Sequence, residues 1–281
     1  MLRTLASIPR RRPPPAIVSV LPSTRRCVHH LPQLQHDFSG GLENFMTPES
    51  FDMAWVKRQT SLLQKIDQYT ADTELQDMEV KYLLLKTARE PPLAHIFNHA
   101  SMAHNNHFYF SGLSPTPDMP IPPFLKKELE AAFSSIETLR REFIFIAAGM
   151  FGPGFVWLVK HDFGQYRVLP TYLAGSPYSG AHWRRQPADM NTAPPITTGM
   201  DYFHNAQAVH KGPIGDRPPG GIDVEPLLCL NTWEQTWAYD FGYEIDSAGG
   251  KAAFAKAWWR YIDWEKVQSR AKMTQGHFRG A

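Results

Sequence analysis

The chain has 281 residues, with 29 Lys and Arg against 27 Asp and Glu and a formal charge of +2. This length is enough for one large or two small domains with real cores, and it excludes a peptide-sized binder. Two cysteines exclude a disulfide scaffold and a four-cysteine zinc site. The near-neutral balance argues against a strongly basic nucleic-acid binder. The sequence contains no uninterrupted run of about 18 apolar residues, so it predicts no membrane span.

The N-terminus carries an uneven share of the charge. No acidic residue precedes Asp37, and six arginines lie at positions 3, 10, 11, 12, 25 and 26. An Arg-rich, acid-free N-terminus containing Ser and Thr is typical of a mitochondrial transit peptide, which is predicted over residues 1–30. A basic arm that stays on the protein is the alternative. Removal of residues 1–30 leaves 23 basic against 27 acidic residues, a formal charge of −4, with Cys229 as the single thiol.

The next part of the chain, residues 31–115, is predicted to form a helical hairpin. Apolar residues recur every three or four positions over 48–69 and 77–113, with few glycines. The double proline at 91–92 must begin a new segment or kink an old one. A proline-rich linker, TPDMPIPP, follows the hairpin.

Residues 116–281 are predicted to form an α/β domain with a small antiparallel sheet, so that the fold class is α+β. A helix over 124–133 precedes one that has a serine cap at 134 or 135 and Glu137 in its first turn. Strands are expected over 155–162 and 165–173, separated by a turn containing Gly164. Residues 179–221, with six Pro and six Gly, are interpreted as a long loop. A single amphipathic helix is expected over 249–270.

Five blocks in the right order resemble the iron/manganese superoxide dismutases, and the resemblance covers most of residues 31–270. The blocks in this sequence are LPQLQHDF, FNHASMAHNNHFYFSGLSP, FGPGFVWLV, LLCLNTWEQTW and IDWEKVQSR. The resemblance implies the dismutase fold, a helical hairpin followed by an α/β domain. Activity does not follow from a fold and has to be read from the site.

The same resemblance locates the four metal ligands of the enzymes, three histidines and one aspartate, and all four are replaced. The matching positions carry Ala54, Asn106, Asn231 and Gln235, while a tyrosine and a histidine near the metal are replaced by Leu62 and Arg58. Side-chain amides are weak donors and bring no charge to balance a redox ion. No metal, no cofactor and no enzymatic activity are therefore expected. The amides of Asn231 and Gln235 can hydrogen-bond each other or water.

Four histidines crowd one helical segment, at positions 95, 99, 104 and 107. Pairs at i,i+3 or i,i+4 have a spacing at which two imidazoles can share an ion. The alternative, which is favoured, is hydrogen-bonded or surface histidines. His107 follows the ligand position by one residue, and a helix turns by about 100° per residue, so it is expected to point out of the former site.

Glu234 matches the dismutase glutamate that bridges to the metal-ligand histidine of the other subunit, and it is predicted to lie at a dimer interface. Local capping is the alternative. A metal-less dismutase-like chain with an import signal resembles the dismutase-like proteins of the fungal mitochondrial ribosome, two of which associate as a heterodimer on its small subunit. The resemblance implies a structural protein of that subunit in the mitochondrial matrix, partnered by a second dismutase-like protein and other small-subunit proteins. An active matrix dismutase and a non-ribosomal matrix dimerisation protein remain alternatives.

Limited contact with ribosomal RNA is expected from the long loop and the basic tail after Glu265. Guanidinium and aromatic groups on a flexible segment suit phosphate contacts and base stacking. A solvated insertion and a frayed terminus are the alternatives. The candidate contact residues are Arg184, Arg185, Lys211, Arg217, Arg270 and Lys272.

Overall fold

The computed structural model describes residues 28–161, 164–182, 224–243 and 249–276. Nearly all of the predicted transit peptide lies outside the described residues, and so does most of the long loop. Four of the candidate RNA contacts fall in that loop, and of Lys272 only the helical backbone is described. The four loop residues are Arg184, Arg185, Lys211 and Arg217.

The first arm of the hairpin is one continuous helix built from three pieces. These are α1 (Pro48–Phe51), the π-helical turn η1 (Asp52–Lys57) and α2 (Arg58–Thr70). Thr47 precedes α1 and caps it, because its side chain accepts a hydrogen bond from the backbone N–H of Ser50. The start of this helix is therefore set by Thr47, which caps it, and by Pro48 at its first position.

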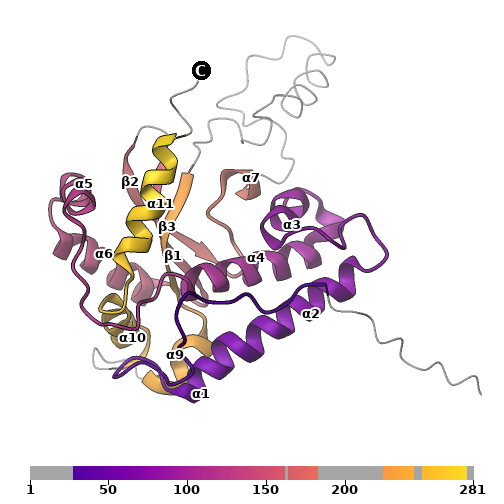
Figure 1. Ribbon diagram of the computed structural model, residues 1–281, viewed down its shortest axis with the longest axis horizontal. Coiled ribbons are helices and arrows are strands. Elements are labelled where there is room, and N and C mark those ends of the chain that lie inside the picture. Colours follow the sequence, from indigo (N-terminus) through magenta and orange to yellow (C-terminus); the bar gives the residue numbers. More distant parts are fainter. Residues whose placement is uncertain (1–27, 162–163, 183–223, 244–248, 277–281) are drawn as a thin grey trace, which may run out of the picture.

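The second arm of the hairpin contains a break. It consists of α3 (Val80–Thr87), the 3₁₀ turn η2 (Pro91–Leu93) and α4 (Ala94–Phe110). Proline at the first positions of η2 begins a new segment there, one of the two outcomes expected for the double proline. Both α2 and α3 pack against α4, and Figure 1 shows α4 lying between α2 and the sheet.

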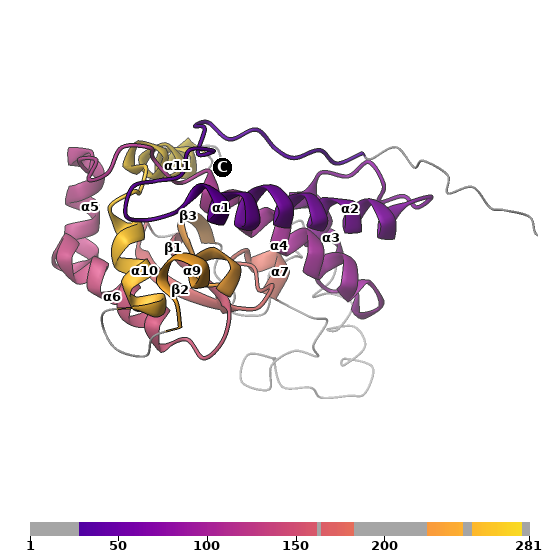
Figure 2. The same cartoon turned by 90° about the horizontal axis from the view of Figure 1, so that it is seen from below.

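Two helices connect the hairpin to the sheet. The first is α5 (Pro123–Phe133) and the second is α6 (Ile136–Gly149). Ser135 caps α6 by accepting a hydrogen bond from the N–H of Thr138, as its position before Glu137 predicts. Figure 2 shows α5 and α6 gathered at the end of the molecule opposite α2 and α3, and α6 packs against a later helix, α10 (Gly250–Trp259).

The sheet has three antiparallel strands in the order β2-β1-β3. They are β1 (Gly154–His161), β2 (Tyr166–Tyr172) and β3 (Val224–Asn231). Gly164, with a φ of 72°, allows the tight turn between β1 and β2. The predicted α+β class with a small antiparallel sheet is therefore confirmed. Phe155 pairs with Asn231, which places the last residue of β3 beside the start of the central strand.

The C-terminal part differs from the expectation in one respect. After α7 (Ser179–His182) and α9 (Glu234–Phe241), the chain forms α10 and then α11 (Trp264–Gly276), so the single helix predicted over 249–270 is wrong. Ile262 forms a bridge with Leu113, and the Asp263 carboxylate accepts a hydrogen bond from the N–H of Lys266, 2.9 Å away. The bridge holds Ile262 in an extended pairing with Leu113, and the Asp263 carboxylate caps the start of α11. Because a cap starts a new helix, α10 and α11 are separate helices.

One hydrophobic core joins the hairpin to the sheet. Tyr109 of α4, Trp157 of β1 and Trp258 of α10 are each no more than 1% exposed. Cys229 of β3 also lies in this core, and burial raises the pKa of its thiol well above the usual value. This cysteine therefore packs as an apolar side chain, since reactivity requires the thiolate.

Candidate functional site

The structure brings together three of the four positions that hold metal in the dismutases. Asn106 lies on α4, Ala54 on η1 and Asn231 at the end of β3, and each is no more than 1% exposed. The Asn106 amide Nδ2 donates a hydrogen bond to the backbone oxygen of Ala54 at 3.1 Å. The Asn231 Nδ2 donates to Asn106 Oδ1, also at 3.1 Å. The three former ligand positions are therefore tied directly to one another.

A fourth member of this cluster, Gln59 on α2, was not singled out from the sequence. The Asn106 Nδ2 donates its second hydrogen bond to Gln59 Oε1 at 3.1 Å, and Gln59 Nε2 donates to the backbone oxygen of Ala103 at 2.9 Å. Asn231 Oδ1 accepts from the backbone N–H of Trp233 at 2.9 Å. A signal was available, because Gln59 falls within the apolar stripe of its helix. We call Ala54, Gln59, Asn106 and Asn231 the amide network.

The π-helical turn contributes a backbone acceptor to the amide network. In an α-helix the N–H of Arg58 would donate to the oxygen of Ala54, four residues earlier. Here that N–H donates to the oxygens of Met53 and Trp55 instead. The Ala54 oxygen is thus free of the Arg58 N–H and accepts from Asn106. Single π turns inside α-helices are often found at functional sites, and this one serves the contact between the two arms.

The amide network does not fit a redox metal. Ala54 has no side-chain donor, and the amide nitrogens of Asn106 and Asn231 use their hydrogens on protein oxygens. The amide oxygens of Gln59, Asn106 and Asn231 each accept a hydrogen bond within the protein. An ion at this position would have to displace these bonds and would find neither an imidazole nor a carboxylate among the network residues.

Gln235, the fourth former ligand position, stays outside the network. Asn231 bonds to Asn106 rather than to Gln235, so of the two options for these amides the direct bond between them does not form. The Gln235 Nε2 is buried and has no hydrogen-bond partner among the described residues. The Arg58 guanidinium lies over the ring of Trp233, 5.8 Å from its centroid, and burial lowers the Arg58 pKa. Leu62, the other replaced residue, is buried in the core.

The crowded histidines of α4 make individual contacts rather than a shared centre. Tyr69 packs edge-on against the rings of His95 and His99, and His99 Nδ1 lies 2.8 Å from the backbone oxygen of His95. His104 Nε2 lies 3.0 Å from the Tyr178 hydroxyl, and burial lowers the pKa of His104 to about 3. The His107 ring lies beside Trp55, with centroids 5.8 Å apart, and burial lowers its pKa as well. No group of three or more His, Cys, Asp or Glu that could hold a metal occurs in the described ranges.

Arg270, expected as an RNA contact, is instead used inside the protein. Its guanidinium stacks on the ring of Phe108, 3.7 Å from the centroid, and donates to the Leu227 oxygen at 2.8 Å and to the Ser111 hydroxyl at 2.9 Å. Burial lowers the Arg270 pKa to about 10. Because these contacts hold α11 against α4 and β3, the side chain is not free to reach a phosphate, and the prediction for Arg270 is corrected.

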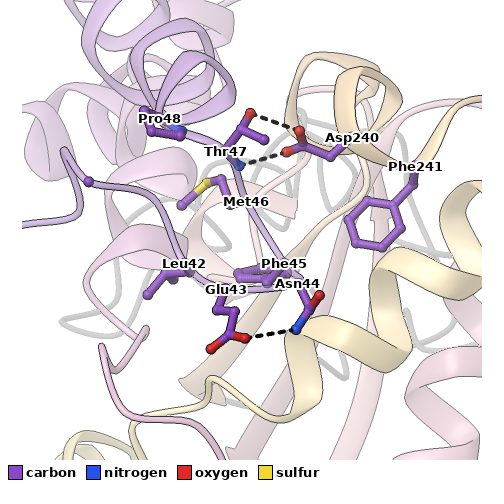
Figure 3. Close-up of a pocket in the computed structure, with 10 residues that line it drawn as sticks. Leu42, Glu43, Asn44, Phe45, Met46, Thr47, Pro48, Asp240 and Phe241 are labelled. Atoms are coloured by element: carbon purple, nitrogen blue, oxygen red, sulfur yellow. Dashed lines mark hydrogen bonds between the residues drawn. The ribbon is translucent and has the colours of Figure 1, made fainter.

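A cavity of about 570 Å³ lies away from the amide network, between the loop before α1 and the end of α9 (Figure 3). Thr47 donates to the Asp240 carboxylate from its backbone N–H at 3.1 Å and from its hydroxyl at 2.8 Å. Figure 3 shows Phe241 on the far side of the same space. These bonds attach α9 to the start of the hairpin, and the cavity contains no set of residues suited to catalysis among those described.

The start of α9 exposes a different kind of surface. Glu234 is half-buried in the first turn of α9, and Lys251 is the cation that interacts with its carboxylate. Trp233 donates from its indole to the Leu173 oxygen at 3.3 Å, and the N–H of Leu173 donates to Pro153. Leu173 is 60% exposed and Phe151 is 96% exposed. We call Phe151, Leu173, Trp233 and Glu234 the apolar face.

Known proteins similar to this chain include both superoxide dismutases and ribosomal proteins. Residues 122–187 and 208–270 match the C-terminal domain of the iron/manganese superoxide dismutases. The small ribosomal subunit protein mS43 of Schizosaccharomyces pombe is 28% identical over 232 residues, covering 80% of this chain and 78% of the relative. The small ribosomal subunit protein mS42 of the same yeast is 27% identical over 199 residues, 69% of this chain and 74% of the relative. An iron superoxide dismutase of Entamoeba histolytica is 25% identical over 240 residues, 85% and 97% of the two chains.

Residues 122–187 and 208–270 are therefore similar to the C-terminal domain of the iron/manganese superoxide dismutases, and they contain three of the five sequence blocks. The chain is similar both to small ribosomal subunit proteins and to an iron superoxide dismutase, and the predicted resemblance to both is confirmed. In the part of the chain that the structure describes, none of the helices is long and apolar enough to cross a membrane.

Proposed function

We propose that the protein is a structural component of the small subunit of the mitochondrial ribosome and not a superoxide dismutase. The observation that carries the proposal is the similarity to two small ribosomal subunit proteins, one of them over 80% of this chain. The amide network supports it, because buried, mutually bonded amides have replaced the imidazole and carboxylate ligands that a redox metal needs. The protein then acts in the mitochondrial matrix, supports translation as a scaffold and needs no cofactor.

The apolar face is the proposed contact with a second dismutase-like chain. Burying a large apolar side chain contributes about 1.5–3 kcal/mol of favourable free energy compared with leaving it in water. Phe151 is almost fully exposed, so contact with a partner surface would gain this free energy. Glu234 adds a half-buried carboxylate beside this apolar area, and an apolar centre with a charged neighbour is typical of specific interfaces. Two different small-subunit proteins of one yeast resemble this chain, which favours a pair of unlike chains over a homodimer.

Contact with ribosomal RNA is proposed to be limited to the long loop and the tail. After the correction of Arg270, the candidates are Arg184, Arg185, Lys211, Arg217 and Lys272. A chain whose predicted mature form has a formal charge of −4 is expected to be held mainly by protein contacts, because phosphate binding requires clustered cations.

Sedimentation of mitochondrial extracts tests the ribosomal role. The protein is expected to travel with the small subunit at low salt and to stay with it when the large subunit is dissociated. A profile confined to the soluble fractions would exclude the ribosomal role and leave the non-ribosomal matrix dimer. Mass spectrometry of proteins that co-purify with the chain distinguishes a second dismutase-like partner from an unrelated one.

A further inference from the structure

The first described residues of the chain are held by one carboxylate. The backbone N–H groups of Val28 and His29 donate to the side chain of Asp67, at 3.1 and 3.2 Å. The His29 ring nitrogen Nδ1 lies 2.6 Å from the same carboxylate, and its Nε2 lies 3.0 Å from the backbone oxygen of Met78. Two consecutive residues are thus bonded to α2 and to the loop before α3. We call Val28, His29, Asp67 and Met78 the anchor.

The position of Asp67 on its helix supports a binding role. Asp67 lies in the last turn of α2, where the helix dipole is negative and a carboxylate is unfavourable. Its side chain is only 13% exposed, and that of His29 is 10% exposed. A nearly buried carboxylate at a helix C-terminus needs donors close by, and the described residues supply them from the segment that begins at Val28.

From the anchor the chain continues as an extended segment along α2, as Figures 1 and 2 both show. Its side chains alternate between exposed and half-buried, and Leu34 packs against the core before Phe38, which is 1% exposed. Without the anchor, this segment would be attached only further along the chain. The anchor therefore fixes residues 28 and 29 of a segment that runs along α2.

We propose that Asp67 and Met78 form the binding site for Val28 and His29, and that proteolytic maturation leaves Val28 in place. The predicted import segment ends in this region, at residue 30. Cleavage at that residue would remove both backbone donors and the His29 ring, and it would leave Asp67 nearly buried without these partners. The boundary of the removed segment therefore lies before Val28. This inference goes beyond the ribosomal role and does not depend on it.

Sequencing of the N-terminus of the protein isolated from mitochondria tests the boundary directly. The expected first residue is Val28 or any residue before it. A mature chain that begins at His29 or later would overturn the proposal. The result does not depend on association with a ribosome, so it is separable from the sedimentation experiment.

Limited digestion of the full chain by a protease of broad specificity tests the anchor itself. In the wild type, cleavage within residues 28–38 is expected to be slow. Asp67→Ala and His29→Ala remove bonds to a charged group and are expected to speed cleavage within residues 28–38 by about tenfold, because bonds of this kind contribute more than 1 kcal/mol.

Matched controls lie beside each anchor residue. Asp77→Ala removes an exposed carboxylate next to Met78, and His30→Ala removes the exposed neighbour of His29. Neither is expected to change the cleavage rate. If Asp67→Ala does not fold, His29→Ala keeps the test available, because it leaves the helix and the carboxylate unchanged. Equal rates for His29→Ala and His30→Ala would overturn the anchor.

Discussion

The amide network and the apolar face lie next to each other in the chain, since Asn231 and Glu234 are three residues apart, yet they are built in opposite ways. In the network, the amide groups of Gln59, Asn106 and Asn231 have partners inside the protein. On the face, Phe151 and Leu173 are exposed, and the Glu234 carboxylate is only half-buried. The buried amides therefore have their hydrogen-bond partners within this chain, whereas the surface beside them exposes groups that a partner protein can contact.

The largest expected effect comes from breaking the interior. Asn106→Ala removes both donors and the acceptor that join Ala54, Gln59 and Asn231, and it leaves their polar atoms buried without these partners. We expect a loss of about 4 kcal/mol in the free energy of unfolding, measured by urea denaturation. Asn98→Ala, at an exposed position on the same helix, is the control and should change stability little. Equal stability of the two variants would show that the network does not support the fold.

The second effect is a pH dependence of the interior. Burial lowers the pKa of His104 from 6.5 to about 3, so between these values the unfolded chain binds a proton that the folded chain does not. Stability contributed by the neutral ring is present above pH 6.5 and is lost as pH falls toward 3, by about 2 kcal/mol at pH 5.

His104→Gln is expected to reduce this difference between pH 7 and pH 5. Asn98→Ala, which changes an exposed residue without a titratable group on the same helix, should leave the difference unchanged. Denaturation curves at the two pH values measure it. An identical pH dependence for wild type and His104→Gln would contradict the assignment to His104.

The third effect concerns the face and should leave the interior untouched. Glu234→Ala is expected to weaken binding of the partner chain about tenfold, because a charged group at an interface loses its partner. Glu265→Ala, in the first turn of α11, controls for the general loss of an acidic residue from a helix start. Affinity measured with the co-purified partner decides between them. Unchanged affinity for Glu234→Ala would favour the local capping role.

The smallest expected effect is that of metal. The purified protein should contain no stoichiometric iron or manganese by elemental analysis. Its melting temperature should shift by less than about 1 °C on addition of EDTA or of either metal, since a ligand stabilises only the state that it binds. An authentic iron dismutase carried through the same steps is the control. Bound metal together with dismutase activity would restore the enzyme alternative.

Much of the fold and the position of the amide network could be predicted from the sequence. The helical hairpin, the cap at Ser135 and the first two strands follow from periodicity and local signals. The replaced ligand positions follow from the resemblance, which aligned Ala54, Asn106 and Asn231 well enough that the structure finds them in contact.

The rest depends on contacts between distant segments. Gln59 meets Asn106 across 47 positions of sequence, and Arg270 meets Ser111 across 159. No local pattern shows that an arginine in a basic tail will stack on Phe108 instead of binding a phosphate. The break between α10 and α11 was missed for the same reason, because it depends on the bridge from Ile262 to Leu113.

The bond between Asn231 and Asn106 also bears on whether evolution could restore the enzyme. Asn231→Asp alone would replace the donor that faces Asn106 Oδ1 with a charged oxygen, so that two acceptors would meet in a buried position. A histidine at position 106 would in turn have to displace Gln59. Both of these single substitutions would pass through a destabilised protein, so the bonded amides make the metal-ligand set of the dismutases difficult to assemble one mutation at a time.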